Sequence, residues 1–556
     1  MSSRQFNLAD LFETVVDTVP ERLALVAGVE RRTYRQLDER SNRFAHHLEG
    51  LGLAAGSHVG ILANNRVEWA EAMIGCYKAR IVPVNLNYRY VAPELRYVIE
   101  NAELELLVFE ETLAPLVTES LASPASPGEH PRPVSLRLMV LRDGPGATLS
   151  KRDAGLPGGE VAVPALDADH FEDAIESSSP ERNFEPRSPD DIYVLYTGGT
   201  TGLPKGVLWR QEDIFFAAMG GGGWGAKPIA HPDELAGRIN PDDGARAVLL
   251  VMAPLMHGNA QWVMWNGFMM GGTAVLYTEH RYDPDRLWRL VEEERVVSIG
   301  LVGDAMARPL AEALDGAPSG RYDTSSLLVI GSGGAMLSSA VKAELKEHLP
   351  HVMVMDRFGS SESGAHGAVE EGAVGPRFMM DEDTSVLDDD LRPLVPGDGR
   401  IGRLARTGRI PLGYFKDQVK TDATFPVDAD GVRWSVPGDL ASVELDGSIT
   451  VLGRGSTSIN TGGEKVFPEE VEAVVKSHPD VFDAIVVGIP DDRFGERVAV
   501  VVQPRLRHGS PTLEGLQEHC RGHIAGYKVP RQLVEVDSVP LTAAGKPDAK
   551  GARELF

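Results

Sequence analysis

A segment rich in glycine and threonine, with one lysine, carries the clearest chemical signal in this chain of 556 residues: it runs from Tyr196 to Gly206 and reads YTGGTTGLPKG. Glycines let backbone N–H groups approach a ligand closely, and successive N–H groups can enclose an anion. The threonine hydroxyls add donors, and Lys205 adds a positive charge. Because an apolar strand, Ile192 to Leu195, leads directly into the segment, we expect a loop that holds a nucleotide polyphosphate rather than a solvated, flexible turn. It is not a Walker loop, since Gly206 stands where that motif requires Ser or Thr.

Two further segments, the first of them rich in glycine, differ from the dinucleotide-binding and hydrolase motifs that they partly resemble. A predicted strand, Leu327 to Ile330, leads into Gly331-Ser332-Gly333-Gly334-Ala335-Met336, where Met336 replaces the last Gly or Ala of a dinucleotide fingerprint. In the segment Phe358 to Ser363, FGSSES, the final serine replaces the second glycine of a hydrolase GxSxG motif. Glu362 offers a hard oxygen ligand of the kind that Mg²⁺ prefers, although a solvated loop carboxylate is the alternative.

Four shorter segments complete the set of candidates. Pro254 to Gly258 contains His257, which lies in an apolar run where a core histidine is the ordinary reading. Pro437-Gly438-Asp439 offers a carboxylate that could accept two hydroxyl donors. The run from Gly453 to Val471 reads GRGSTSINTGGEKVFPEEV, and Pro540 to Pro547 reads PLTAAGKP, with Lys546 after a glycine.

In this order the segments resemble the motifs of the adenylate-forming superfamily, which includes acyl-CoA synthetases, peptide-synthetase adenylation domains and luciferases. The resemblance extends from Thr33-Tyr34 to Lys546 and implies an enzyme that uses ATP, Mg²⁺ and CoA. The implied catalytic residues are Lys546, His257 and Lys205, and the implied Mg²⁺ ligands are Glu362 and Thr201. The implied residues for binding ATP and CoA are Thr197, Gly198, Gly199, Thr200, Thr201, Gly202, Gly333, Gly334, Ala335, Phe358, Gly359, Ser360, Ser361, Asp439, Arg454, Gly462, Gly463 and Glu464.

The resemblance also implies a role for each group. Asp439 and Arg454 would bind the ribose, Gly462 to Glu464 would line the tunnel for the pantetheine arm of CoA, and His257 would border the acyl pocket. The chain departs from the usual pattern at four positions. Gly198 replaces a serine, Met256 an aromatic residue, Pro437 a threonine and Thr457 the usual Asp or Lys pivot. We expect the departure at Gly198 to adjust the activity rather than to abolish it, whereas the identity of the hinge residue stays open.

Composition limits the classes of partner and compartment. A formal net charge of −26 argues against a nucleic-acid partner. Two cysteines, Cys76 and Cys520, exclude a disulfide framework and fit a cytoplasmic protein. The N-terminus does not read as a signal peptide, and polar residues interrupt the most apolar stretch, Ala247 to Tyr277, so we expect a buried strand–helix–strand unit there and no membrane span. Peripheral membrane contact and a homodimer stay open.

The order of patterns predicts an α/β fold with a large N-terminal domain of layered sheets and helices and a small, mobile α+β C-terminal domain. We place the first domain at 1–453, a hinge at 454–457 and the second domain at 458–556. Early elements include a strand over His58–Leu62 and a helix over Val67–Ala79. The C-terminal part contains a helix over Pro468–Ser477 and another over Leu513–Ile524.

The resemblance implies a carboxylic acid–CoA ligase that forms acyl-AMP and then acyl-CoA. The region around His257 is rich in Met and Trp, which suits a large apolar acid. The amino-acid sequences of the motifs resemble those of bacterial ligases for long-chain or steroid side-chain acids. One alternative is an acyl-AMP ligase that delivers to a carrier protein, with residues 220–245 restricting rotation. Another is a non-catalytic protein that binds acyl-adenylate or a nucleotide.

Overall fold

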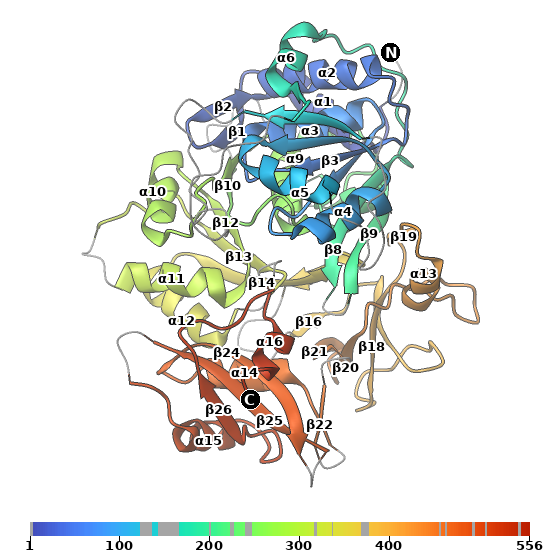
Figure 1. Ribbon diagram of the computed structural model, residues 1–556. Helices are drawn as coiled ribbons and strands as arrows, with labels where there is room; N and C mark the ends of the chain where they lie inside the picture. Colours follow the sequence, from blue (N-terminus) through green and yellow to red (C-terminus); the bar gives the residue numbers. More distant parts are fainter. Residues whose placement is uncertain are drawn as a thin grey trace. The chain divides into compact units, whose positions relative to one another are not determined.

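The contacts between residues divide the chain into two units. Unit 1 comprises residues 1–300, 322–327 and 409–422, and unit 2 comprises 301–321, 328–408 and 423–556. The computed structural model (Figure 1) describes residues 4–122, 136–142, 166–199, 202–222, 227–239, 247–315, 320–335, 337–368, 377–454, 458–461, 464–491, 495–505, 509–542 and 546–556. Residues 455–457 of the predicted hinge lie outside this part of the chain, so the predicted domain limits remain a prediction.

Unit 1 carries most of the parallel strands. Its elements, two of which end one or two residues beyond its limits, are α1 (Leu8–Thr18), β1 (Leu23–Ala27), β2 (Glu30–Thr33), α2 (Tyr34–Gly50), β3 (His58–Leu62), α3 (Val67–Lys78), β4 (Val82–Asn85), α4 (Ala92–Asn101), β5 (Leu104–Glu110), η1 (Glu111–Leu113), α5 (Ala114–Ala122), β6 (Arg137–Leu141), β7 (Asp169–His170), α6 (Phe171–Ser177), β8 (Ile192–Gly199), β9 (Gly202–Arg210), α7 (Gln211–Ala217), α8 (Glu234–Arg238), β10 (Val248–Val251), α9 (Gly258–Met269), β11 (Thr273–Leu276), α10 (Pro284–Glu294), β12 (Ser298–Leu301), β19 (Gly413–Tyr414) and α13 (Gln418–Thr424).

One parallel sheet of unit 1 has five strands in the order β4-β3-β5-β6-β7. The core strands β3 and β5 read HVGIL and LELLVFE, the near-continuous apolar runs expected where both faces of a parallel sheet are covered. The strand predicted over His58–Leu62 has those bounds, and the helix predicted over Val67–Ala79 ends one residue earlier. The predicted alternation of strands and helices is therefore confirmed in this part of the chain.

A second group of strands in unit 1 has the order β12-β10-β11-β1-β2, with β2 antiparallel at the edge. α9 connects β10 to β11, which confirms the buried strand–helix–strand unit predicted between Ala247 and Tyr277. Met264, Trp265 and Met269 on α9 have no exposed surface, and Trp265 packs edge-on against Phe12. The Met and Trp residues of α9 thus build the core, and they are weaker evidence for a large acyl pocket than the sequence suggests.

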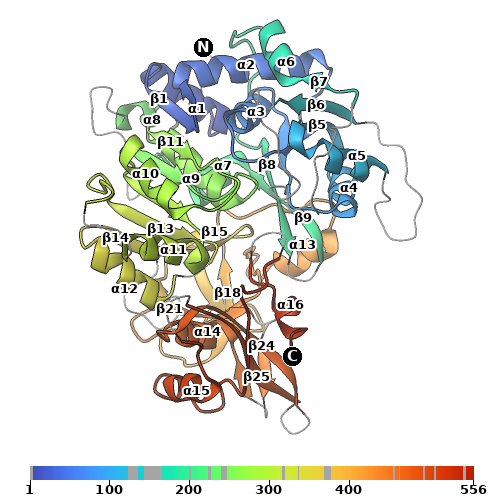
Figure 2. The ribbon, with the colours of Figure 1, turned by 60° about the vertical axis from the view of Figure 1, so that its left-hand side comes forward.

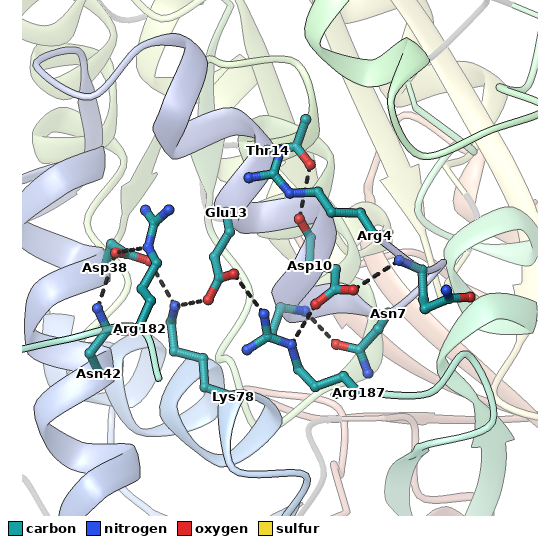
Figure 3. Close-up of polar contacts among 12 residues, drawn as sticks. Arg4, Asn7, Asp10, Glu13, Thr14, Asp38, Asn42, Lys78, Arg182 and Arg187 are labelled. Carbon is teal, nitrogen blue, oxygen red and sulfur yellow. Dashed lines mark hydrogen bonds and ion pairs between the residues drawn. The ribbon is translucent and has the colours of Figure 1, made fainter. Parts of the chain in front are cut away.

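A buried ionic network ties the segment before β8 to helices α1, α2 and α3 (Figure 3). Lys78 at the end of α3 has no exposed side-chain surface, and its Nζ lies 2.6 Å from Glu13 and 2.7 Å from Asp38. Arg187 donates to Glu13 at 2.6 Å, and Arg182 donates to Asp38 at 2.8 Å. Each buried carboxylate therefore has two cationic partners, which offsets the cost of removing these charges from water.

Unit 2 carries two largely antiparallel sheets, a further group of three strands, and helices from α11 to α16 apart from α13. Its elements are α11 (Gly303–Asp315), β13 (Val329–Gly333), α12 (Ser339–His348), β14 (Met353–Ser360), β15 (Gly364–Ala368), β16 (Arg377–Met379), β17 (Thr384–Leu387), β18 (Ile401–Arg406), β20 (Asp439–Val443), β21 (Ser448–Arg454), β22 (Ile459–Thr461), β23 (Glu464–Val466), α14 (Pro468–Lys476), β24 (Val481–Asp491), β25 (Gly495–Pro504), α15 (Leu513–Arg521), β26 (Gln532–Glu535) and α16 (Ala549–Arg553).

Three groups of strands build unit 2. β13 and β14 run parallel, with β15 antiparallel beside β14. An antiparallel sheet in the order β16-β21-β20-β18-β17 encloses its own apolar cluster around Phe378 and Ile449. In the C-terminal part the order is β23-β22-β25-β24, with β26 parallel to β25, and α14 packs against β24 (Figure 2). The two helices predicted there are present, ending one and three residues earlier than expected.

Candidate active site

The segment predicted to bind phosphate is the end of a β-hairpin. β8 continues past the predicted strand to Gly199, and β9 begins at Gly202, so Thr200 and Thr201 at the tip lie outside the described residues. Thr197 pairs with Lys205 and Gly199 with Gly202 across the two strands. Directly opposite residues of an antiparallel pair project from the same face. The hairpin therefore presents a hydroxyl and an ammonium group together just below its tip.

Lys205 is held by a carboxylate from β19 and its following turn, which lie beside β9 (Figure 1). Its Nζ donates to Asp417 Oδ2 at 2.5 Å and lies 5.8 Å from the ring centroid of Tyr414. The Lys205 hydrogen bond, followed by the backbone N–H of Lys420, holds the pKa of Asp417 below its ordinary value. The side chains of Lys205 and Asp417 are 36% and 32% exposed, so an anion in solution can reach this ammonium group.

The hairpin requires glycine at Gly206, which pairs with Tyr196. A Cβ added at Gly206 would lie 2.6 Å from the Tyr196 ring, closer than any van der Waals contact allows. The Tyr196 hydroxyl donates to Asn101 at 2.7 Å, and burial raises the pKa of this phenol. Close packing against Tyr196 beneath the hairpin therefore accounts for glycine at this position.

His257 occupies the N-cap position of α9 and is half-buried, at the end of a turn that follows β10. Its backbone N–H donates to Pro254 O at 2.9 Å, which closes the turn. The backbone at this N-cap position is extended, and the imidazole accepts no capping hydrogen bond from the helix. Lys205, Thr197 and His257 all belong to unit 1.

In unit 2 the predicted adenine turn begins where β13 ends. Gly333 is the last strand residue, two residues beyond the predicted turn's start, and Gly334 has a φ of +90°. The Ser332 hydroxyl accepts from the Gly303 N–H at 2.8 Å and donates to Ala335 O at 2.9 Å, so it fixes the turn from below. Gly334 and Ala335 are exposed, and their backbone is accessible to a planar ligand.

The predicted Phe-Gly-x-x-Glu motif lies at the end of β14 and the turn to β15. The Phe358 ring stacks on Phe378, with centroids 5.7 Å apart and planes at 14°, and lies 5.7 Å from His366. Burial lowers the pKa of His366 to about 3, so this imidazole is neutral at pH 7. Gly359 is required because a Cβ there would lie 2.4 Å from Gly364 O. A cavity of about 210 Å³ adjoins the motif and is lined by Met355, Arg357, Ala365, His366 and Gly367.

Glu362 is half-buried in the same turn, and its carbonyl oxygen accepts the Ser435 hydroxyl at 2.5 Å. Within the described part of the chain no three His, Cys, Asp or Glu side chains are grouped to hold a metal ion. A single carboxylate nevertheless fits Mg²⁺, which commonly binds through one or two carboxylates with waters and substrate phosphates. The donor set is therefore compatible with Mg²⁺ delivered with ATP, and Glu362 is the described residue that would hold it.

The predicted ribose residues are opposite each other on two strands. Asp439 at the start of β20 pairs with Arg454 at the end of β21, and Asp439 is 7% exposed. Gly438, with a φ of +106°, turns the chain immediately before the carboxylate. Gly453 has a φ of +119°, and a Cβ there would lie 2.3 Å from Glu469 Oε2. The structure thus brings Asp439 and the backbone of Arg454 together, and their role in binding ribose stays a prediction.

The remaining predicted residues lie in the C-terminal part. β22 and β23 pair at Thr461 and Glu464, on either side of Gly462 and Gly463, which lie outside the described residues. Lys546 is exposed, its backbone N–H donates to Thr542 Oγ1 at 3.2 Å, and its carbonyl accepts the Thr542 N–H at 2.8 Å. These two bonds join Thr542 to Lys546, and the side chain of Lys546 is exposed.

Several residues with positioning contacts were not identified from the motifs. Asp417 is separated from Lys205 by 212 positions, and Asn85 is separated from Tyr196, to which it is hydrogen-bonded, by 111 positions. Neither lies in a segment with a recognisable chemical pattern. Asn85 is the last residue of an apolar strand, VPVN. Its amide is the only feature of the local sequence that could have indicated a positioning role.

Comparison with known proteins decides the family. A model described as AMP-binding enzyme matches residues 12–414, and one described as AMP-binding enzyme C-terminal domain matches 470–546. The chain belongs to the AMP-binding enzyme family. It is 44% identical over 564 residues to a 3-oxocholest-4-en-26-oate–CoA ligase of Rhodococcus rhodochrous, covering 99% of this chain and 95% of that protein. It is also 44% identical over 559 residues to a medium/long-chain-fatty-acid–CoA/3-oxocholest-4-en-26-oate–CoA ligase of Mycolicibacterium smegmatis, covering 99% and 96%.

The fold of this AMP-binding enzyme matches solved structures over almost its whole length. The anthranilate CoA ligase AuaEII in complex with anthranoyl-AMP has a TM-score of 0.81 at 22% identity, covering 99% of this chain and 97% of that one. The predicted superfamily, the enzyme class and the α/β fold with a large N-terminal and a small C-terminal domain are therefore confirmed. The individual residue roles stay predictions. Among the described residues no helix is long and apolar enough to cross a bilayer.

Proposed function

We propose that the protein joins a medium-chain, long-chain or steroid side-chain carboxylic acid to CoA at the expense of ATP. The observation that carries the proposal is the full-length likeness to ligases whose names specify these acids, at 44% identity. That likeness extends over the hairpin with Lys205 in unit 1 and the loop with Lys546 in unit 2. The proposal thus assigns residues of both units to one reaction.

In the first half-reaction a carboxylate oxygen of the acid attacks the α-phosphorus of ATP. The bond from the α-phosphorus to the bridging oxygen breaks, pyrophosphate leaves, and acyl-AMP forms. Negative charge grows on the phosphoryl oxygens, and fixed cations aimed at that charge lower the barrier. Lys205 holds the β- and γ-phosphates at the hairpin, and Lys546 neutralises charge at the reacting phosphate. Mg²⁺ held by Glu362 would supply further charge neutralisation when bound.

In the second half-reaction the CoA thiol, after losing its proton, attacks the carbonyl carbon of acyl-AMP. The bond from that carbon to the phosphate oxygen breaks, AMP leaves, and a thioester forms. Asp439 and Arg454 retain the ribose, and the Gly462–Glu464 segment admits the pantetheine arm. A rotation of the C-terminal part about residues 455–457 would withdraw Lys546 between the two steps, because the charge that it stabilises develops only while the adenylate is being formed.

A substrate panel tests the proposal. Purified protein is incubated with ATP, MgCl₂ and CoA and with acetate, octanoate, palmitate or 3-oxocholest-4-en-26-oate, and the products are identified by mass spectrometry. We expect acyl-CoA, AMP and pyrophosphate in equal amounts from octanoate, palmitate or the steroid acid. Pyrophosphate released with acyl-AMP, but with no acyl-CoA, would point to delivery to a carrier protein instead. ADP as the nucleotide product, or a preference for acetate, would overturn the proposal.

A further inference from the structure

Three buried side-chain amides hold the turn that carries His257. We call Ala253–His257 the His257 turn. Asn65, which follows β3, donates to Ala253 O at 3.2 Å and accepts the Leu255 N–H at 2.7 Å. Gln261 on α9 donates to Leu255 O at 2.8 Å. Asn85 at the end of β4 donates to Met256 O at 2.7 Å.

Asn85 alone among these amides also holds the backbone of the phosphate hairpin. Its Nδ2 donates to Tyr196 O at 2.9 Å, and its Oδ1 accepts the Tyr196 N–H at 2.8 Å. Tyr196 is the residue immediately before Thr197, and Met256 is the residue immediately before His257. One amide group therefore contacts the backbone next to both predicted ligand-binding residues.

The chemistry of the site requires an amide. Two carbonyl oxygens, those of Tyr196 and Met256, face the nitrogen of Asn85, and one backbone N–H faces its oxygen. Asparagine supplies two donors and an acceptor, whereas aspartate would place oxygen against both carbonyls. Asn85 is 4% exposed, so water is a poor substitute for any of these bonds, and losing the amide leaves three buried polar groups unpaired.

We propose that Asn85 is a positioning residue that couples the binding of the acid at the His257 turn to the binding of ATP at the phosphate hairpin. The inference rests on the proposed function, which places the acid beside His257 and the triphosphate at the hairpin. A ligand that orders either backbone segment also orders the other through the amide, because shared buried hydrogen bonds make the two segments move together. Coupling of this kind is reciprocal: the acid strengthens ATP binding by the same factor as ATP strengthens acid binding.

Asn65 and Asn266 provide matched controls within the same unit. Asn65 supports the same turn from β3 without contacting the hairpin, and its Nδ2 also donates to Tyr277 O at 3.0 Å. Asn266 is a fully buried amide on α9 that donates to Trp262 O at 2.8 Å. Asn65→Ala should weaken acid binding while the coupling persists, and Asn266→Ala should lower stability without changing the coupling.

The test is a calorimetric titration of the full-length protein with α,β-methylene-ATP, which cannot transfer its adenylyl group to the acid, in the absence and presence of saturating octanoate. We expect octanoate to tighten nucleotide binding by about five-fold or more in the wild-type protein, and by less than about two-fold in Asn85→Ala. The inference would be overturned if octanoate tightened nucleotide binding as much in Asn85→Ala as in the wild type. It would also be overturned if Asn65→Ala lost this effect equally, or if octanoate did not tighten nucleotide binding in the wild type. Acyl-CoA formation by the wild type is measured separately, so its absence marks a failure of the proposed function instead.

A second measurement needs no variant, in case Asn85→Ala does not fold. Hydrogen exchange of the wild-type protein is followed by mass spectrometry with octanoate as the only ligand. We expect slower exchange in peptides covering β8, at the hairpin, in addition to those covering the His257 turn. Protection confined to the turn would contradict coupling through Asn85.

Discussion

Lys78 provides the sharpest test of how the N-terminal helices are held together. Its ammonium group has no exposed surface, and it contacts Glu13 and Asp38, whose side chains are 9% and 5% exposed (Figure 3). Methionine has a similar shape but no charge, so Lys78→Met leaves both carboxylates with one cation fewer. Removing one partner of a buried ion pair typically costs about 3 to 5 kcal/mol.

The pKa of Glu13 supports a magnitude in this range. Burial acts to raise this pKa, but the charges of Lys78 and then Arg187 outweigh it and lower the pKa from 4.5 to about 2. At 1.36 kcal/mol per unit, the net shift corresponds to about 3 kcal/mol of stability at pH 7. Because the pKa is depressed in the folded state, this contribution is fully present above about pH 4.5 and is lost as pH falls through about 2.

The assay is urea unfolding monitored by hydrogen exchange in peptides that cover α1 and α3, because a chain with two units need not unfold in one step. Lys416→Met is the matched control, since Lys416 pairs with Glu103 at 2.5 Å but the two side chains are 42% and 65% exposed. We expect a loss of about 3 to 5 kcal/mol for Lys78→Met and less than about 1 kcal/mol for Lys416→Met. The Lys78→Met deficit should also shrink on acidification, because Glu13 without Lys78 is protonated at higher pH. Equal effects of the two variants, or a deficit that grows in acid, would refute this reasoning.

Four further predictions concern the reaction. Asp417→Asn removes the negative charge beside Lys205 but keeps an acceptor for the backbone N–H of Lys420. Calorimetry should show pyrophosphate binding about three-fold tighter or more, because Asp417 no longer offsets the positive charge of Lys205. Weaker binding would show that Asp417 aligns Lys205 instead. Lys546→Ala should slow acyl-AMP formation by about 10² to 10³ while supplied acyl-AMP still reacts with CoA, and equal losses in both half-reactions would make Lys546 structural. Gly206→Ala, with a Cβ 2.6 Å from a tyrosine ring, should raise the KM for ATP at least about ten-fold, whereas Gly237→Ala, with nothing within 4 Å, should not. Octanoate should exceed acetate by at least about 100-fold in kcat/KM, given about 0.8 kcal/mol per buried methylene; a ratio below ten would show that the acyl chain is not buried.

The order of motifs was sufficient to predict the fold class and the family, because each motif is local in sequence and has its own chemical constraint. The hairpin shows where local reasoning ended: glycines at 198, 199 and 202 suggested a loop, yet the strands continue to Gly199 and from Gly202. Strand pairing between Thr197 and Lys205 decides that geometry, and it depends on the partner strand rather than on composition.

The positioning contacts could not be predicted for a related reason. Asn85 and Asp417 act through partners more than a hundred positions away, and a single amide or carboxylate is too common in sequence to mark a site. The Met- and Trp-rich run illustrates the opposite error, since Trp265 and Met269 are apolar residues suited to a pocket but are packed in the core. Periodicity identifies buried residues without indicating whether they face a ligand or another side chain.

Transfer of an oxygen atom tests the central claim most directly, because only adenylation joins the acid to the α-phosphorus. The protein is given octanoate labelled with ¹⁸O in both carboxylate oxygens, together with ATP, MgCl₂ and CoA, and the products are analysed by mass spectrometry. The account predicts one ¹⁸O atom in AMP, none in pyrophosphate, and one retained in octanoyl-CoA. Label in inorganic phosphate with ADP as the nucleotide product, or unlabelled AMP, would contradict it.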